Sequence, residues 1–133
     1  MTVLVGKSAP DFTAKAVMGD NSINENFNLK AHLKGKIGVL FFYPLDFTFV
    51  CPTEIAEFNK EYKNFRTRET EVYGLSCDSQ FVHLAWRNSH ADLNALQFPM
   101  LADNKKELSE ALGILHPIEK VPLRATYIVD PDG

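Results

Sequence analysis

The chain has 133 residues, of which 45% are hydrophobic and 23% charged, a composition typical of one soluble globular domain over residues 1–133. Its formal net charge of −3, without a cluster of Lys or Arg, argues against nucleic acid or a membrane surface as the main partner. The N-terminus lacks the charged leader and apolar core of a secretory signal. We therefore expect a cytoplasmic protein whose two cysteines are reactive or buried thiols rather than a structural disulfide.

The N-terminal part of the chain predicts a β-hairpin. Gly6-Lys7-Ser8 looks like the end of a phosphate-binding loop, but no glycine precedes it at the required spacing, so we interpret it as an ordinary loop. Two short strands with a turn at Gly19-Asp20-Asn21 follow. The apolar residues of these strands are Phe12, Ala14 and Ala16 in the first and Phe27 and Leu29 in the second.

A near-continuous apolar run over residues 37–43 predicts a strand buried on both faces, because the run is too short for a helix. Such strands lie at the centre of parallel sheets. Pro44 cannot donate to a strand ladder and ends the strand. Cys51 stands directly before Pro52, a residue that suits the first position of a helix. We therefore place Cys51 at a helix start, where unpaired N–H groups and the positive end of the dipole favour a thiolate.

The segment after Cys51 predicts one helix of about four turns. Apolar residues recur in it at spacings of three and four, and Glu54 near its start and Arg66 near its end match the helix dipole. The apolar residues are Ile55, Phe58, Tyr62 and Phe65.

A strand over residues 72–77, a helix capped by Asp78-Ser79 and a polar loop over residues 89–97 come next. Residues 98–102 predict a short strand, which Pro99 makes an edge or irregular one. The helix capped by Asp78-Ser79 carries Phe81, Leu84, Ala85 and Asn88.

Asp103 can cap a short helix that Gly113 ends, and residues 123–129 predict the last strand, which runs into a turn at residues 130–133. Strands and helices that alternate with short links predict an α/β sheet with helices on both faces. Because this sheet ends on an unpaired strand, we expect the chain to be part of a longer protein. The apolar residues of the short helix are Leu108, Ala111 and Leu112.

No spacing pairs the four histidines with one another or with a cysteine pair, so the sequence predicts no metal site and no cofactor. We interpret Trp86 and the phenylalanines as core residues rather than as a base-stacking surface. The histidines, interpreted as solvated or capping residues, are His32, His83, His90 and His116.

The two cysteines have different settings. Cys77 ends an apolar strand, where a free cysteine most often packs as a small hydrophobic residue. Cys51 belongs to a P-x-x-x-T-x-x-C pattern with Pro44 and Thr48, which places a hydroxyl group three residues before the sulfur. A thiolate also needs a cation, and Arg124 is a candidate because it opens a strand that can lie beside the central one. An arginine that reaches out to solvent from a strand end is an equal alternative.

The chain resembles the typical two-cysteine peroxiredoxins, the alkyl hydroperoxide reductase C group, in FYPLDFTFVCPTEI, GKSAPDF, CDSQFVHLAW and LRATYIVDPDG. The resemblance covers the entire chain and implies a thioredoxin-like sheet flanked by helices, with an N-terminal β-hairpin. It implies that Cys51 is the peroxidatic cysteine and that Pro44, Thr48 and Arg124 complete the peroxide pocket. Glu54 matches the acid that holds the pocket arginine.

By the same resemblance the substrates are hydrogen peroxide and organic hydroperoxides. The electron donor is thioredoxin or a flavoprotein disulfide reductase, and the full-length form is a homodimer or a ring of dimers. The family's resolving cysteine, last strand and last helix would lie past Gly133, and Cys77 does not match the resolving site.

Two other classes of function stay open. A thioredoxin-like thiol-disulfide oxidoreductase would use the same fold, but Cys51 does not begin a CxxC motif. A truncated, non-catalytic module that forms oligomers or binds client proteins is the other alternative, favoured by the exposed sheet edge.

Overall fold

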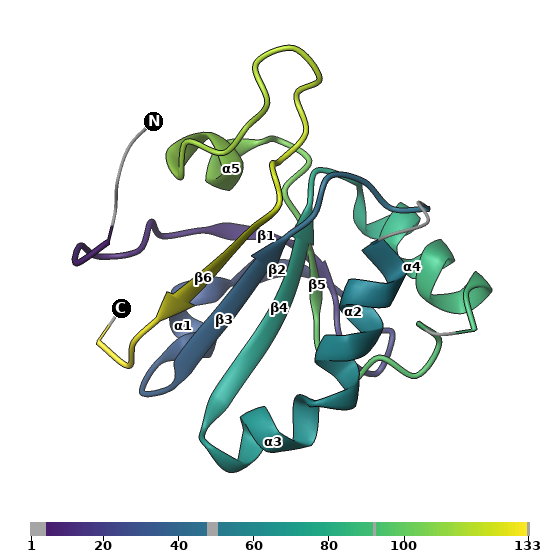
Figure 1. Cartoon of the computed structure of the whole chain (residues 1–133), viewed down its shortest axis with the longest axis horizontal. Coiled ribbons are helices and arrows are strands. Elements are labelled where there is room, and N and C mark those ends of the chain that lie inside the picture. The colour runs from purple at the N-terminus through teal and green to yellow at the C-terminus, as the bar shows by residue number, and fades with distance from the viewer. Residues whose placement is uncertain (1–4, 48–50, 92, 133) are drawn as a thin grey trace.

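The computed structural model describes residues 5–47, 51–91 and 93–132, and of Cys51 and Pro52 it describes the backbone. Within these residues the strands form one mixed sheet with the order β2-β1-β5-β4-β3-β6 (Figure 1). The strands are β1 (Thr13–Val17), β2 (Ile23–Asn28), β3 (Ile37–Phe42), β4 (Thr70–Ser76), β5 (Met100–Ala102) and β6 (Ala125–Val129). The helices are α1 (Leu29–Leu33), α2 (Cys51–Lys60), α3 (Tyr62–Thr67), α4 (Gln80–Ser89) and α5 (Glu107–Ala111).

Two apolar clusters cover the two faces of the sheet. On one face α1 and α5 pack over Leu40 and Phe42, and on the other face α2, α3 and α4 pack over Val39 and Phe41. The split follows from the alternation of side chains along β3. Figure 1 shows α2 and α3 in front of the sheet and α1 behind it. The predicted α/β sheet with helices on both faces is therefore confirmed.

The predicted N-terminal hairpin is also confirmed, since β1 and β2 pair antiparallel and Met18 N donates to Ser22 O at 2.8 Å. The strand predicted over residues 37–43 forms as β3, but its predicted place at the centre of a parallel sheet was wrong. It pairs parallel with β4 and antiparallel with β6, and of the strands described only β6 lies beyond it. Among the described strands none pairs with the outer edge of β6, in agreement with the unpaired edge that the sequence predicted.

The strand at residues 98–102 is shorter than predicted and is not at an edge. β5 lies between β1, with which it pairs antiparallel, and β4, with which it pairs parallel. Pro99 precedes β5 and takes part only as an acceptor, from Gly74 N at 3.1 Å. Its missing N–H group is therefore no obstacle to an interior strand.

The single helix predicted after Cys51 is two helices. α2 ends at Lys60, Glu61 has φ −92° and ψ 2°, and α3 starts at Tyr62. The apolar spacing gave no sign of this break because Ile55 and Tyr62 stay buried on both sides of it. Position 61 also keeps its hydrogen bond to Glu57 O at 3.2 Å.

Two predictions about helices were wrong. Leu29 belongs to α1 rather than to a strand, because Asn28 caps a helix there by accepting from Ala31 N at 2.8 Å. In α4, Phe81 was interpreted as a core residue but is 65% exposed. Ser79 caps α4 as predicted. The residues of α4 that are buried are Gln80, His83, Trp86 and Arg87.

The C-terminal part follows the sequence more closely. Asp103 accepts from Leu108 N and Ser109 N at 3.1 and 2.8 Å, and Gly113 takes a φ of +72° just after α5. The turn after β6 is closed by Asp132 N, which donates to Asp130 Oδ1 at 3.0 Å. Among the helices in the described ranges, none has the length and hydropathy that crossing a bilayer requires.

Candidate active site

The chain leaves β3 after Phe42 and re-enters regular structure in α2, whose first residue is Cys51. The predicted place of Cys51 at a helix start is confirmed for its backbone. A helix start carries N–H groups without intrahelical acceptors and the positive end of the dipole, and both stabilise an anion. The side chain of Cys51 and the whole of Thr48 lie outside the described residues, whereas Pro44 is described and is half-buried.

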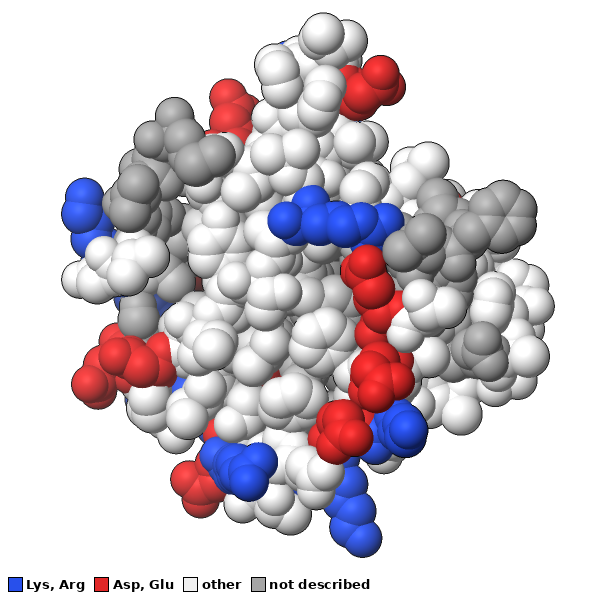
Figure 2. Space-filling model, in the orientation of Figure 1, with Lys and Arg blue, Asp and Glu red and all other residues white. Residues whose placement is uncertain are grey.

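A groove of about 700 Å³ lies between α2 and β6. One wall carries acidic residues, which Figure 2 shows as a column along α2 with a basic side chain across its end. The floor is apolar, and the rings of Phe41 and Phe58 stack in it with centroids 4.3 Å apart. The acidic residues that line the groove are Glu54, Glu57 and Glu61, and the other lining residues are Phe42, Thr53, Phe65, Arg124, Ala125 and Thr126.

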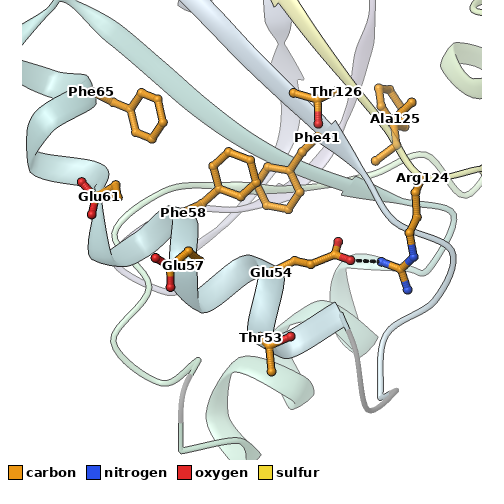
Figure 3. Close-up of a pocket in the computed structure, with 11 residues that line it drawn as sticks. Phe41, Thr53, Glu54, Glu57, Phe58, Glu61, Phe65, Arg124, Ala125 and Thr126 are labelled. Carbon is orange, nitrogen blue, oxygen red and sulfur yellow. Dashed lines mark hydrogen bonds and ion pairs between the residues drawn. The ribbon is translucent and has the colours of Figure 1, made fainter.

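An ion pair closes the end of this groove nearest the start of α2. Arg124 Nη1 lies 2.6 Å from Glu54 Oε1, and Figure 3 shows the two side chains reaching toward each other from β6 and α2. The strand register explains the meeting. Ala125 pairs with Phe42, so Arg124, one residue earlier in the antiparallel strand, lies level with Tyr43, where the chain turns toward α2.

Arg124 has a partner at the start of α2. Its side chain is 42% exposed, but it is paired with Glu54 rather than directed only into solvent. Glu54 stands in the first turn of the helix that Cys51 begins, so the guanidinium is held at that helix start. A positive group there can stabilise negative charge on a sulfur or on a reacting oxygen. The structure thus brings Arg124 and Glu54 together, and their roles in a reaction stay predictions.

The sequence did not reveal a buried pair, His83 and Asp46, beside the segment that leaves β3. His83, interpreted as solvated or capping, is fully buried, with Nδ1 2.6 Å from Asp46 Oδ2 and Nε2 2.9 Å from Leu101 O. The Tyr43 hydroxyl donates to the other carboxylate oxygen of Asp46 at 2.6 Å. No local pattern links Asp46 to His83, because 37 positions separate them.

Cys77 packs on the other side of the molecule from α2. It is half-buried, and its sulfur lies 3.9 Å from Ser109 Oγ on α5. Burial and the carboxylate of Asp103 raise the pKa of the Cys77 thiol. A raised pKa makes this thiol a poorer nucleophile at neutral pH, in agreement with its interpretation as a packing residue.

The histidines and acids of the described residues form no group of three or more that could hold a metal ion. His116 is a capping residue as predicted, because its Nδ1 accepts from Ile118 N and Glu119 N at 3.2 and 3.0 Å. His32 is partly buried and contacts the Tyr73 hydroxyl group. Burial lowers the pKa of His32, so it is mostly neutral at pH 7.

Comparison with known proteins gives one consistent result. The AhpC/TSA family matches residues 5–133. Alkyl hydroperoxide reductase C of Buchnera aphidicola (Acyrthosiphon pisum) is 44% identical over 131 residues, which are 96% of this chain and 66% of that protein. Peroxiredoxin-2 of Mus musculus is 49% identical over 132 residues, which are 97% of this chain and 65% of that protein.

Among solved structures, the reduced 2-Cys peroxiredoxin of Plasmodium vivax matches with a TM-score of 0.91 and 40% identity over 98% of this chain and 81% of that one. This likeness confirms the predicted thioredoxin-like fold. The chain spans about two thirds of the length of the curated relatives named above.

Proposed function

The chain belongs to the AhpC/TSA family, and we propose that it is a thiol-dependent peroxidase that reduces hydrogen peroxide and alkyl hydroperoxides through Cys51. The observation that carries the proposal is the Glu54–Arg124 ion pair at the start of α2. This ion pair holds a positive group beside the helix start. By the family resemblance, the reacting sulfur of Cys51 belongs to the same helix start. The names of the relatives support the same chemistry.

In the proposed reaction the Cys51 thiolate attacks one oxygen of the hydroperoxide. A sulfur–oxygen bond forms as the O–O bond breaks, and the second oxygen takes up a proton and leaves as water or an alcohol. The sulfur is oxidised to a sulfenic acid, the peroxide is reduced, and no cofactor takes part.

Each proposed site residue has a distinct task. Arg124 stabilises the charge that moves along the O–O bond, and Glu54 holds the guanidinium in place. The Thr48 hydroxyl donates to the peroxide, and Pro44 keeps water from the sulfenic acid. Lowering a thiol pKa from about 8.5 to about 6 raises the thiolate fraction at pH 7 only about 30-fold, so Arg124 and Thr48 must supply the rest of a fast reaction.

The proposal extends to partners and location. Thioredoxin or a flavoprotein disulfide reductase would return the sulfur to the thiol, in a cytoplasmic homodimer or ring of dimers. Residues 1–133 would form one domain. The thiol-disulfide oxidoreductase alternative lacks a CxxC motif. The outer edge of β6 is the feature that favours a non-catalytic module, but it offers no role for the ion pair at the start of α2.

Peroxide consumption under stopped flow tests the proposed function. We expect wild-type protein to react with one equivalent of hydrogen peroxide much faster than free cysteine does, and to form a dimedone-reactive sulfenic acid on Cys51. Cys51→Ser should lose this reaction and Cys77→Ser should keep it. Equal loss in both variants, or a wild-type rate no faster than that of free cysteine, would refute the proposal.

A further inference from the structure

The segment that leaves β3 is anchored by a chain of buried hydrogen bonds through Tyr43, Asp46, His83 and the carbonyl group of Leu101. The side chains of Asp46 and His83 have no exposed surface. Every polar side-chain atom in this chain of hydrogen bonds has a partner. More generally, no buried side-chain nitrogen or oxygen of the described residues is left without one. Such a complete buried network gives the backbone that it holds a single arrangement.

The donors and acceptors fix where the protons lie. Leu101 O can only accept, so Nε2 of His83 carries a hydrogen. Nδ1 of His83 and the facing oxygen of Asp46 therefore share one further proton. Burial and the neighbouring Asp46 raise the pKa of Tyr43, so its hydroxyl group stays a donor. The carboxyl group of Asp46 is thus the only member that links the tyrosine to the histidine.

The backbone of residue 46 is held as well. Asp46 N donates to Asp78 Oδ2 at 2.8 Å, and the same oxygen accepts from Ser76 Oγ at 2.7 Å. Asp46 is therefore tied to the ends of β3 and β4 and to α4. The next residue, Phe47, has a φ of +59°, a left-handed conformation that is unfavourable for an L-residue. Anchors of this kind are what such a conformation requires in order to persist.

We propose that Asp46 is a positioning residue for the reaction of Cys51, an inference that rests on the peroxidase function proposed above. Tyr43 and Asp46 bracket Pro44, and the strand register places Arg124 beside this segment. α2 begins at Cys51, five positions after Asp46. By fixing the chain where it leaves β3, Asp46 holds Pro44 in register with Arg124 and sets the entry to the helix that carries the thiol.

Variants of this network can show whether the hydrogen bonds of Asp46 or its negative charge matters for the reaction. Asp46→Asn keeps every hydrogen bond, because its oxygen accepts from Tyr43 and its NH₂ group donates to Nδ1 of neutral His83. Asp46→Ala breaks both side-chain links. Tyr43→Phe removes one hydroxyl group and keeps the ring in the core. Asp103→Ala is the matched control, since Asp103 is an equally buried carboxylate that anchors α5.

Two second-order rate constants are measured at Cys51 for each variant, one with hydrogen peroxide and one with iodoacetamide. Alkylation requires a thiolate but no aligned pocket, whereas a misplacement of about 1 Å can slow an aligned reaction about 100-fold. We expect Asp46→Ala to slow the peroxide reaction about 10- to 100-fold, with alkylation unchanged. Asp46→Asn should restore the peroxide rate, and Tyr43→Phe should lower it about three- to tenfold.

Asp103→Ala should lose thermal stability as Asp46→Ala does and keep the wild-type ratio of the two rates. The inference is overturned if Asp46→Ala keeps the wild-type ratio, or if Asp103→Ala changes the ratio equally. Should Asp46→Ala fail to fold, Tyr43→Phe decides, and an unchanged ratio in that variant overturns the inference. A wild-type chain that is inert toward peroxide would refute the proposed function and this inference together.

Discussion

Arg124 is paired with the Glu54 carboxylate, and because 42% of its side chain is exposed this ion pair adds little to stability. Its value lies in where the guanidinium is placed. Arginine presents several N–H donors in a rigid plane. One guanidinium can therefore stabilise negative charge first on the sulfur and then on the departing oxygen. A role in the transition state and a role in lowering the thiol pKa make different predictions.

The first prediction separates these roles with Arg124→Ala. We expect peroxide reduction to slow by more than the roughly 30-fold that a change of thiolate fraction can account for, even at a pH at which Cys51 is fully ionised. Stopped-flow rates at neutral and high pH measure this. Glu54→Gln, which keeps an acceptor for Arg124, is the control and should lose far less. If the peroxide rate of Arg124→Ala recovers fully at high pH, the arginine acts only by lowering the pKa of the Cys51 thiol.

The second prediction concerns the two thiols. Burial, with Asp103 next in importance, raises the pKa of Cys77, so its thiolate fraction at any pH near neutrality is below that of free cysteine. We expect Cys77 alkylation to rise only at more alkaline pH than free cysteine requires, while Cys51 reacts at lower pH. Peptide mapping after iodoacetamide at a series of pH values tests the order. A Cys77 that labels first would contradict it.

Among the helices and strands, α4 shows most clearly that a buried helix face can consist largely of polar residues. Arg87 is fully buried, and its guanidinium donates to Phe98 O and Leu96 O at 2.9 and 3.0 Å. It also donates to Asn21 Oδ1 at 2.9 Å in the hairpin turn. Burial lowers the pKa of Arg87 to about 10, so it stays charged at neutral pH. One side chain thus joins α4, the β1–β2 turn and the segment before β5.

The third prediction follows for Arg87→Met, which keeps the length of the side chain and removes its donors. The carbonyl groups of Leu96 and Phe98 would be left buried without partners, at about 1–3 kcal/mol each. We expect the free energy of unfolding in urea to fall by about 3 kcal/mol or more. Asn88→Met on the exposed face of α4 is the control and should change stability by about 0.5 kcal/mol or less. Similar losses in both variants would show that Arg87 is not an anchor.

For the whole molecule, the two cysteines belong to opposite sides of the sheet. The sulfur of Cys77 faces α5, which packs with α1, whereas α2 packs on the other face. A disulfide needs Cα atoms within about 7 Å and side chains that face each other. Bridging Cys51 and Cys77 would therefore require α2 to unwind or Cys77 to leave its contact with Ser109.

The fourth prediction is the product of one equivalent of peroxide with this chain. We expect one sulfenic acid on Cys51, which dimedone traps, and no bond between Cys51 and Cys77. Small thiols should reduce the sulfenic acid directly, whereas turnover with thioredoxin should be slow, since Cys77 does not match the resolving site of the family. Mass spectrometry of the oxidised protein measures the outcome. A loss of two mass units with the two cysteines linked would instead make Cys77 a resolving residue.

The sequence by itself determined the β-hairpin, the buried strand at residues 37–42, the helix start at Cys51 and the pairing candidates Glu54 and Arg124. These features depend on short-range patterns or on a family motif. An apolar run, a proline next to a cysteine and a capping serine each act within a few residues, so the chain carries their signal locally.

Only the tertiary structure decided the interior place of β5, the break between α2 and α3, the inner face of α4 and the link from Asp46 to His83. Local reasoning put Phe81 inside and His83 outside, because hydrophobicity ranks them so. Burial of His83 and Arg87 becomes favourable once carbonyl and carboxylate groups from distant segments satisfy every donor. Those partners lie many positions away in the chain, and only folding brings them into contact.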